Sequence, residues 1–241
     1  MIGITSYGAY IPWHRLDRQQ FVKAWGGFGV PGERSVSYYD EDSITMAVEA
    51  ALDCLGSRDP ATVDGLYFAT TTSPYREKQC SALMALPLDL PREIRTADFS
   101  ASLRAGSTAL LQAADTVRAG SASSVLATMA DNRIGGISGF QEQTIGDGAA
   151  AFLVGDQDVI AEILGTHSVS DELSGTWRGQ DDLFVRFWED RMVQDKGYTP
   201  VLTQAINGAM KKVGIEPGAF ARVVVDCPGD PRGHAKLLAS L

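Results

Sequence analysis

The residues best suited to covalent chemistry are the thiols, because a thiolate is a strong nucleophile near neutral pH. The chain has three cysteines, Cys54, Cys80 and Cys227, and their spacing shows no pairing. Unpaired cysteines are typical of a reducing compartment, so we expect a cytoplasmic protein. Cys80 lies within an apolar helical pattern, where packing in the core is the expected role of a thiol.

Imidazoles, the usual general bases, are as scarce as the thiols. His14 follows a tryptophan in a predicted loop, His167 lies in a predicted strand, and His234 begins a predicted helix. A surface or capping role is expected for each of them rather than catalysis. The glycine-rich run at 26–32 has the composition of a phosphate cradle, but it does not follow a strand and open a helix as such a cradle requires. We interpret it as a flexible loop.

The junction between a strand and a helix at Ile94–Gly120 is the centre of the predicted fold. A short apolar strand passes through mostly small residues at Ala101–Gly106 into a long helix. Strands and helices alternate around it: strands at Ile2–Ile11, Val63–Thr70, Ser124–Met129 and Ala149–Val154, and helices at Arg18–Trp25, Asp40–Leu55 and Glu77–Leu86. The glycine-rich stretch at 135–148 is expected to be a loop, and the uniformly apolar strand at 149–154 to be buried on both faces. This order is typical of α/β proteins with a mostly parallel sheet covered by helices.

The pattern begins again after residue 156. It predicts a strand, two helices, a strand and a last helix, at Val159–Ser168, Asp182–Asp195, Thr199–Val213, Ala221–Cys227 and His234–Leu241. The sequence therefore predicts two successive βα domains of similar order: a complete first half at residues 1–156 and a partial second half at 157–241. Because an incomplete half leaves a sheet edge and apolar helix faces uncovered, we expect either a partner chain that covers them or a fragment of a longer protein.

Composition excludes several classes of partner. The 241 residues carry a formal net charge of −9, which argues against non-specific binding of nucleic acid or anionic membranes. No stretch reaches the roughly 18 consecutive apolar residues that a membrane span needs. The N-terminal stretch has no basic leader, so no signal peptide is expected.

Five segments resemble, in order and spacing, the 3-hydroxy-3-methylglutaryl-CoA synthases of the thiolase superfamily, which are related to type-three ketoacyl-ACP synthases. They are Val36–Ala51, Ser73–Pro74, Ala97–Gly120, Ala130–Asp131 and Gly146–Val154. The resemblance implies an α/β, thiolase-like fold of two βα halves, with mixed five-stranded sheets and sandwiched helices. It also implies an acyltransferase that forms carbon–carbon bonds. Its ligand would be a coenzyme A thioester, with no covalently bound cofactor and no metal.

The catalytic positions of the family are altered in this chain. The family uses a cysteine at a helix start, a glutamate base and a histidine. Carried across the matching motifs, these positions are Leu103, Thr72 and Asp226. Leucine cannot accept an acyl group, so the resemblance predicts an impaired site.

Two other residues are candidate nucleophiles. Ser102 precedes Leu103, but a serine needs an adjacent base, and no histidine is near it in sequence. Cys227 would enter the pocket if the alignment slipped by one residue, and Asp226 is open to an acid–base role or to that of a solvated turn residue. Arg104, Arg133 and Arg178 are candidates for contacts with CoA phosphates, or are simply solvated.

Three functions remain open from the sequence. The first is a degenerate subunit that handles acyl-CoA and associates with a catalytic thiolase or an OB-fold acyl-CoA-binding protein, as a hetero-oligomer or a homodimer. The second is an active condensing enzyme whose nucleophile is Ser102 or Cys227. The third is a structural α/β domain that makes no contact with CoA.

Overall fold

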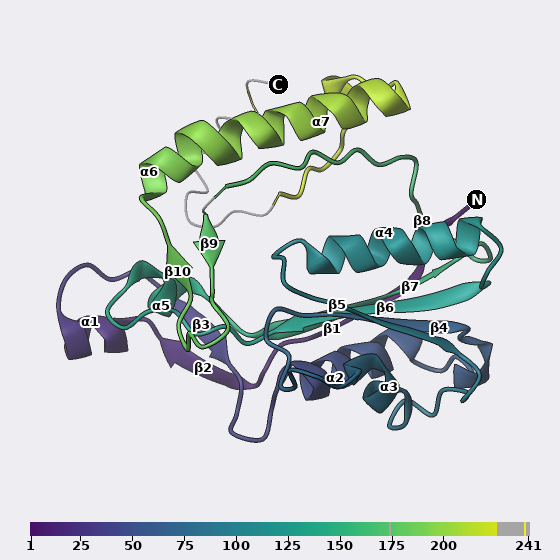
Figure 1. Ribbon diagram of the computed structural model, residues 1–241, viewed down its shortest axis with the longest axis horizontal. Helices are drawn as coiled ribbons and strands as arrows, with labels where there is room; N and C mark the ends of the chain where they lie inside the picture. Colours follow the sequence, from purple (N-terminus) through teal and green to yellow (C-terminus); the bar gives the residue numbers. More distant parts are fainter. Residues whose placement is uncertain (174, 226–238, 240–241) are drawn as a thin grey trace. The chain divides into compact units, whose positions relative to one another are not determined.

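The structure is a computed structural model that describes residues 1–173, 175–225 and 239 (Figure 1). Its internal contacts divide the chain into two compact units, residues 1–163 and 164–241. Within the described ranges, no helix has both the length and the apolar character needed to cross a membrane. The assignment of 157–241 to a partial thiolase-like half stays a prediction.

The first unit is built on a six-stranded sheet with the strand order β5-β4-β6-β7-β1-β8. The strands are β1 (Gly3–Tyr10), β4 (Gly65–Ala69), β5 (Arg95–Phe99), β6 (Ser124–Asp131), β7 (Gly148–Gly155) and β8 (Ala161–Glu162). β4 pairs in parallel with β5 and β6, whereas β6–β7, β7–β1 and β1–β8 are antiparallel. The α/β class and the mixed sheet are confirmed. The expectation of a mostly parallel sheet is wrong, and β8 adds a short sixth strand to the five that were expected.

Helices cover both faces of this sheet (Figure 1). α2 (Ser43–Leu55) and α3 (Cys80–Ala85) pack on one face, and α4 (Ala105–Arg118) packs on the other. α2 begins later than predicted because Asp42 caps it: the Asp42 carboxylate accepts from the N–H groups of Ile44 and Thr45 at 2.9 and 2.8 Å. The neighbouring acids Asp40 and Glu41 therefore precede the helix.

α4 approaches the sheet closely because its inner face is made of small residues. Ala105, Ala109 and Ala113 are buried along it. A Cβ added to Gly106 would lie 3.0 Å from the sulfur of Met129 on β6. This close packing brings the start of α4 to the carboxyl ends of β4 and β6.

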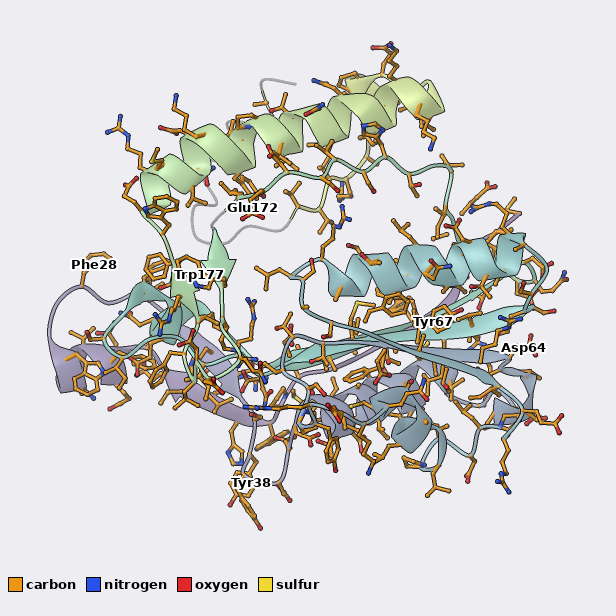
Figure 2. All side chains as sticks on the ribbon, in the orientation of Figure 1. Phe28, Tyr38, Asp64, Tyr67, Glu172 and Trp177 are labelled. Carbon is orange, nitrogen blue, oxygen red and sulfur yellow. The ribbon has the colours of Figure 1, made fainter. Side chains whose placement is uncertain are left out.

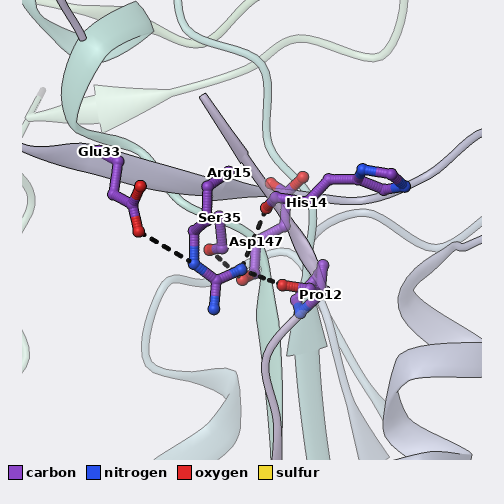
Figure 3. Close-up of polar contacts among 6 residues, drawn as sticks. All are labelled: Pro12, His14, Arg15, Glu33, Ser35 and Asp147. Carbon is purple, nitrogen blue, oxygen red and sulfur yellow. Dashed lines mark hydrogen bonds and ion pairs between the residues drawn. The ribbon is translucent and has the colours of Figure 1, made fainter. Parts of the chain in front are cut away.

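A smaller set of elements flanks β7. These elements are the hairpin of β2 (His14–Asp17) and β3 (Glu33–Val36), the helix α1 (Gln19–Trp25) that connects its two strands, and α5 (Phe140–Thr144). The sequence did not predict the hairpin or α5, which lies in the stretch expected to be a glycine-rich loop. Figure 3 shows how the hairpin is held. Ser35 of β3 donates to the carbonyl oxygen of Asp147, directly before β7, at 2.6 Å, and within the hairpin Arg15 pairs with Glu33 at 3.6 Å. Residues 26–32 form a loop, as expected.

The second unit contains a long helix, α7 (Thr199–Val213), whose bounds match the prediction. It follows α6 (Asp190–Met192) and a π-helical turn, η2 (Val193–Tyr198). The other short elements of the second unit are β9 (Thr176–Trp177), β10 (Arg186–Phe187) and the 3₁₀ turn η3 (Pro217–Ala219); a further 3₁₀ turn, η1 (Pro60–Thr62), belongs to the first unit. The segment before β9 lies along α7, and Lys212 Nζ donates to the carbonyl oxygen of Thr166 at 2.9 Å.

Several predictions for the later part of the chain are wrong. The strand at Val159–Ser168 is only the two-residue β8, and residues 221–225 form no strand. The helix expected at Asp182–Asp195 begins only at Asp190, with α6 and η2; the residues before it form a turn, in which Asp182 accepts from the N–H of Gly179 at 2.9 Å, and β10. A strand needs a neighbour for its backbone groups, and local periodicity does not reveal whether one exists. Residues 226 and 227 of the predicted strand, and the helix expected at 234–241 apart from Ala239, lie outside the described residues.

Candidate functional site

A cavity of about 430 Å³ lies in the first unit, where the carboxyl ends of β4 and β6 meet the start of α4 and of β7. Open α/β sheets bind ligands at this end of their strands. The wall is mostly small and apolar, with four polar side chains. The lining residues are Ala69, Thr70, Ser102, Leu103, Ala105, Gly106, Ser107, Met129, Ala130, Asp131, Gly148, Ala149 and Ala150. β7 is therefore not buried on both faces as predicted, because its first residues are half-exposed around this cavity.

A tight turn presents Ser102 and Leu103 to the cavity. Ala101 has a φ of 63°, the left-handed region that is costly for a residue with a Cβ. The carbonyl oxygen of Ser102 accepts from the N–H of Ala105 at 2.9 Å, and its Oγ accepts from the N–H of Arg104 at 3.2 Å. The Leu103 side chain is 54% exposed at the tip of α4. A helix start lowers the pKa of a thiol placed there, but this position carries an alkyl chain.

Asp131 is the carboxylate of the cavity, and three consecutive threonines hold it. Its Oδ1 accepts from Thr70 Oγ1 at 3.0 Å, from Thr71 N at 2.7 Å and Oγ1 at 3.0 Å, and from Thr72 Oγ1 at 2.9 Å. Thr72 also accepts from the N–H of Asn132 at 3.1 Å and does not line the cavity. The predicted glutamate position thus carries a hydroxyl that orients a different carboxylate.

Sequence reasoning did not single out Asp131 as a site residue. A signal was present, because an acid at the end of a central strand points to the edge where ligands bind. The hydroxyl cluster around it depends on contacts between β4 and β6, which are about 60 residues apart in sequence.

The described cysteines are far from nucleophilic. Cys54 and Cys80 are buried in the core between the sheet and the helices α2 and α3. Burial raises the pKa of both thiols, which favours the unreactive protonated form. The predicted packing role of Cys80 is confirmed.

The histidines of the described ranges do not line the cavity either. His14 is exposed on β2, rather than in a loop, and stacks on Tyr38 with 4.6 Å between ring centroids. His167 belongs to the second unit, where it lies against Gly208 of α7. Among the residues that the structure describes, the cavity therefore contains hydroxyls and one carboxylate, but no thiol and no imidazole. Asp226, Cys227 and His234 lie outside those residues.

Two of the three arginines proposed for CoA phosphates belong to the same unit as the cavity, and the third belongs to the second unit. Arg104 directly follows Leu103 and is exposed, and Arg133 follows Asp131 by two residues. The Nε of Arg133 is buried without a hydrogen-bond partner. Arg178 is exposed in the second unit. Within the first unit, Arg104 and Arg133 are the candidates close in sequence to the residues that line the cavity, and the role of Arg178 stays a prediction.

Comparison with curated proteins identifies the family. The hydroxymethylglutaryl-CoA synthase of Methanocaldococcus jannaschii is 30% identical over 238 residues, which cover 95% of this chain and 68% of the relative. The chain belongs to the hydroxymethylglutaryl-CoA synthase family. The synthase of Pyrococcus furiosus is also 30% identical, over 232 residues that cover 94% of this chain and 66% of the relative. The chain thus spans about two thirds of the length of these relatives. No protein-family model matches it.

Solved structures agree with this family at the level of the fold. An HMG-CoA synthase complexed with CoA superposes with a TM-score of 0.80 and 21% identity, covering 91% of this chain and 58% of that protein. A β-ketoacyl-acyl carrier protein synthase III from Thermus thermophilus gives a TM-score of 0.73 and 25% identity, covering 90% and 74%. The predicted thiolase-like fold is confirmed.

Proposed function

We propose that this member of the hydroxymethylglutaryl-CoA synthase family binds acyl-CoA thioesters at the cavity without forming an acyl-enzyme. The observation that carries the proposal is Leu103, whose side chain lines the cavity at the tip of α4. A covalent intermediate needs a nucleophile that an adjacent base activates. The described cavity provides a binding surface but not that pair.

The remaining features suit a thioester ligand. The small residues of β7 and α4 leave room for an acyl group or the arm that carries it. Asp131, with one oxygen held by the three threonines, can accept a hydrogen bond from an N–H or O–H group of the ligand. Arg104 and Arg133 would attract the phosphates. That a synthase of the same fold is known in complex with CoA supports this ligand class.

A second candidate is a condensing enzyme that uses an unusual nucleophile. Ser102 favours it, because this hydroxyl lines the cavity. Its weakness is the absence of a base among the described neighbours: Asp131 is the carboxylate there, and its Oδ1 is already occupied by several donors. Cys227 is the other nucleophile to be tested.

As a non-covalent binder, the protein would act together with a catalytic subunit. We propose association with a thiolase, or with an OB-fold acyl-CoA-binding protein, rather than independent turnover.

Acetyl-CoA binding and intact mass, measured on the same preparation, test this function. We expect saturable binding of acetyl-CoA by calorimetry and no covalent acetyl adduct by mass spectrometry. Asp131→Ala should weaken binding, while Asp156→Ala, at an exposed position beyond β7, should leave it unchanged. An acetyl adduct that disappears in Ser102→Ala or Cys227→Ala would establish the condensing enzyme instead. Absence of acetyl-CoA binding would instead favour the third function, a structural α/β domain that makes no contact with CoA.

A further inference from the structure

Three aromatic rings form a cluster on the surface of the first unit, and none of them lines the cavity. His14 stacks on Tyr38 at 4.6 Å with an interplanar angle of 25°, and Tyr39 meets Tyr38 edge-on at 4.6 Å. Despite these contacts, Tyr38 is 50% exposed and Tyr39 is 86% exposed. Figure 2 shows Tyr38 projecting outward from the segment between β3 and α2. We call His14, Tyr38 and Tyr39 the tyrosine cluster.

The backbone under the tyrosine cluster is held in place. Tyr38 N donates to Glu41 Oε2 at 2.6 Å, and Glu41 N donates back to the carbonyl oxygen of Tyr38 at 3.1 Å. The other carboxylate oxygen of Glu41 accepts from the hydroxyl of Tyr10 on β1. His14 is fixed by its pairing with Val36 in the hairpin. Rings that are ordered before binding lose little entropy when a partner covers them.

The surroundings of the tyrosine cluster are negatively charged. Asp40 and Glu41 directly follow Tyr39 in the chain, and Glu41 Oε2 accepts from the N–H of Tyr38 at 2.6 Å. The hydrogen bond with Glu41, followed by burial and by the charges of Glu41, Glu49 and Asp40, raises the pKa of the nearby Tyr10 hydroxyl. The neighbouring cation, Arg15, is engaged by Glu33 and by the carbonyl oxygens of Pro12 and His14 (Figure 3). Exposed aromatic rings beside carboxylates attract a guanidinium or ammonium group, which a ring binds through its quadrupole and a carboxylate through its charge.

We propose that the tyrosine cluster is a docking surface for a positively charged protein segment rich in arginine or lysine. Tyrosine and arginine are the residues most enriched at the energetic centres of protein interfaces. The complementary charge selects this occupant, because the −9 net charge of the chain disfavours nucleic acid and anionic membranes. The inference does not depend on whether the cavity binds acyl-CoA or turns it over.

A labelled hexa-arginine peptide and the full chain test this proposal by fluorescence anisotropy. We expect saturable binding that falls about tenfold in the double variant Tyr38→Ser/Tyr39→Ser, since the cation loses its ring partners. The variant Tyr38→Phe/Tyr39→Phe keeps the ring faces and should bind within about twofold of the unsubstituted protein. Asp40→Asn should weaken binding and reduce its dependence on salt.

Tyr7→Ser is the matched control, because Tyr7 is an exposed tyrosine of the same unit that lies on β1 outside the cluster. It should leave the affinity unchanged. Circular dichroism of each variant confirms that these surface substitutions preserve the fold. Absence of peptide binding, or binding that the double serine variant leaves within about twofold, would overturn the proposal, because general charge attraction would then account for it.

Discussion

At the scale of single residues, the site depends on how Asp131 and Leu103 are placed. Asp131 is fixed by donors from three threonines, so its position is set before any ligand arrives. Leu103 is placed by the turn at Ala101, whose backbone lies in the left-handed region, and by the N–H of Ala105, which donates to the carbonyl oxygen of Ser102 at 2.9 Å. The turn therefore presents an alkyl chain to the cavity at the start of α4.

Removing the Asp131 carboxylate should destabilise the protein. In Asp131→Ala the hydroxyls of the three threonines and one backbone N–H lose their acceptor, and we expect a loss of about 2–3 kcal/mol in the free energy of unfolding. Asp131→Asn should lose less, because the amide oxygen still accepts. Urea unfolding measures both. Equal stability of Asp131→Ala and the unsubstituted protein, within about 0.5 kcal/mol, would contradict the role given to the threonines.

At the scale of elements, the hydrogen bond that links Tyr10 of β1 to Glu41, in the segment before α2, makes a pH-dependent contribution to the free energy of unfolding. The hydrogen bond to Glu41, followed by burial and nearby carboxylates, raises the pKa of Tyr10 to about 12. Since the pKa in the folded state is above the unfolded value near 10, this stabilisation is fully present below pH 10 and is lost as the pH rises toward 12.

The variant Tyr10→Phe removes the hydroxyl, so it separates the stabilisation by the Tyr10–Glu41 hydrogen bond from the other causes of unfolding at high pH. Urea unfolding at several values between pH 8 and about pH 11 should show a decline in stability that is steeper in the unsubstituted protein than in the variant. Tyr7→Phe, at an exposed position of the same strand, serves as the control and should retain the steep decline. Parallel curves for Tyr10→Phe and the unsubstituted protein would show that the Tyr10–Glu41 contact does not stabilise the packing of β1 against the segment before α2.

The elements that the sequence predicted well are those with strong local signals. α7 has the predicted bounds, and β1, β4, β6 and β7 of the central sheet begin and end within two residues of expectation. The hairpin β2–β3, α5 and the irregular region before α7 were missed because short elements depend on tertiary contacts. The candidate site shows the same contrast between local and tertiary signals. The turn at Ser102 and Leu103 was predicted from the local sequence. The grouping of Asp131 with Thr72 was not predicted, because it requires β4 and β6 to lie side by side.

At the scale of the whole molecule, the two units differ in how much of them is buried. Every residue of β4 is buried in the first unit, whereas α7 has no fully buried residue. Val223 and Val224, which follow α7 in the second unit, are exposed. The first unit therefore has a core of its own, and the second presents apolar surface.

Hydrogen exchange measured by mass spectrometry should reveal this difference. We expect the amides of β4 and β6 to exchange only on global unfolding, and those of α7 to exchange through local opening, at least tenfold faster. Addition of a partner that covers the second unit should slow exchange in α7 and leave β4 unchanged. Equal protection of α7 and β4 in the isolated chain would mean that the second unit is stabilised as strongly as the first.

The most direct test of the central claim is the intact mass of Leu103→Cys after incubation with acetyl-CoA, in a Cys227→Ala background. If the cavity binds the thioester, a thiol at this position should gain one acetyl group even without an adjacent base, because the start of a helix lowers the pKa of a thiol placed there. Ser107→Cys, within the first turn of α4, should react far more slowly. The unsubstituted protein should gain none. An acetyl adduct on the unsubstituted protein, or none on Leu103→Cys, would contradict the account.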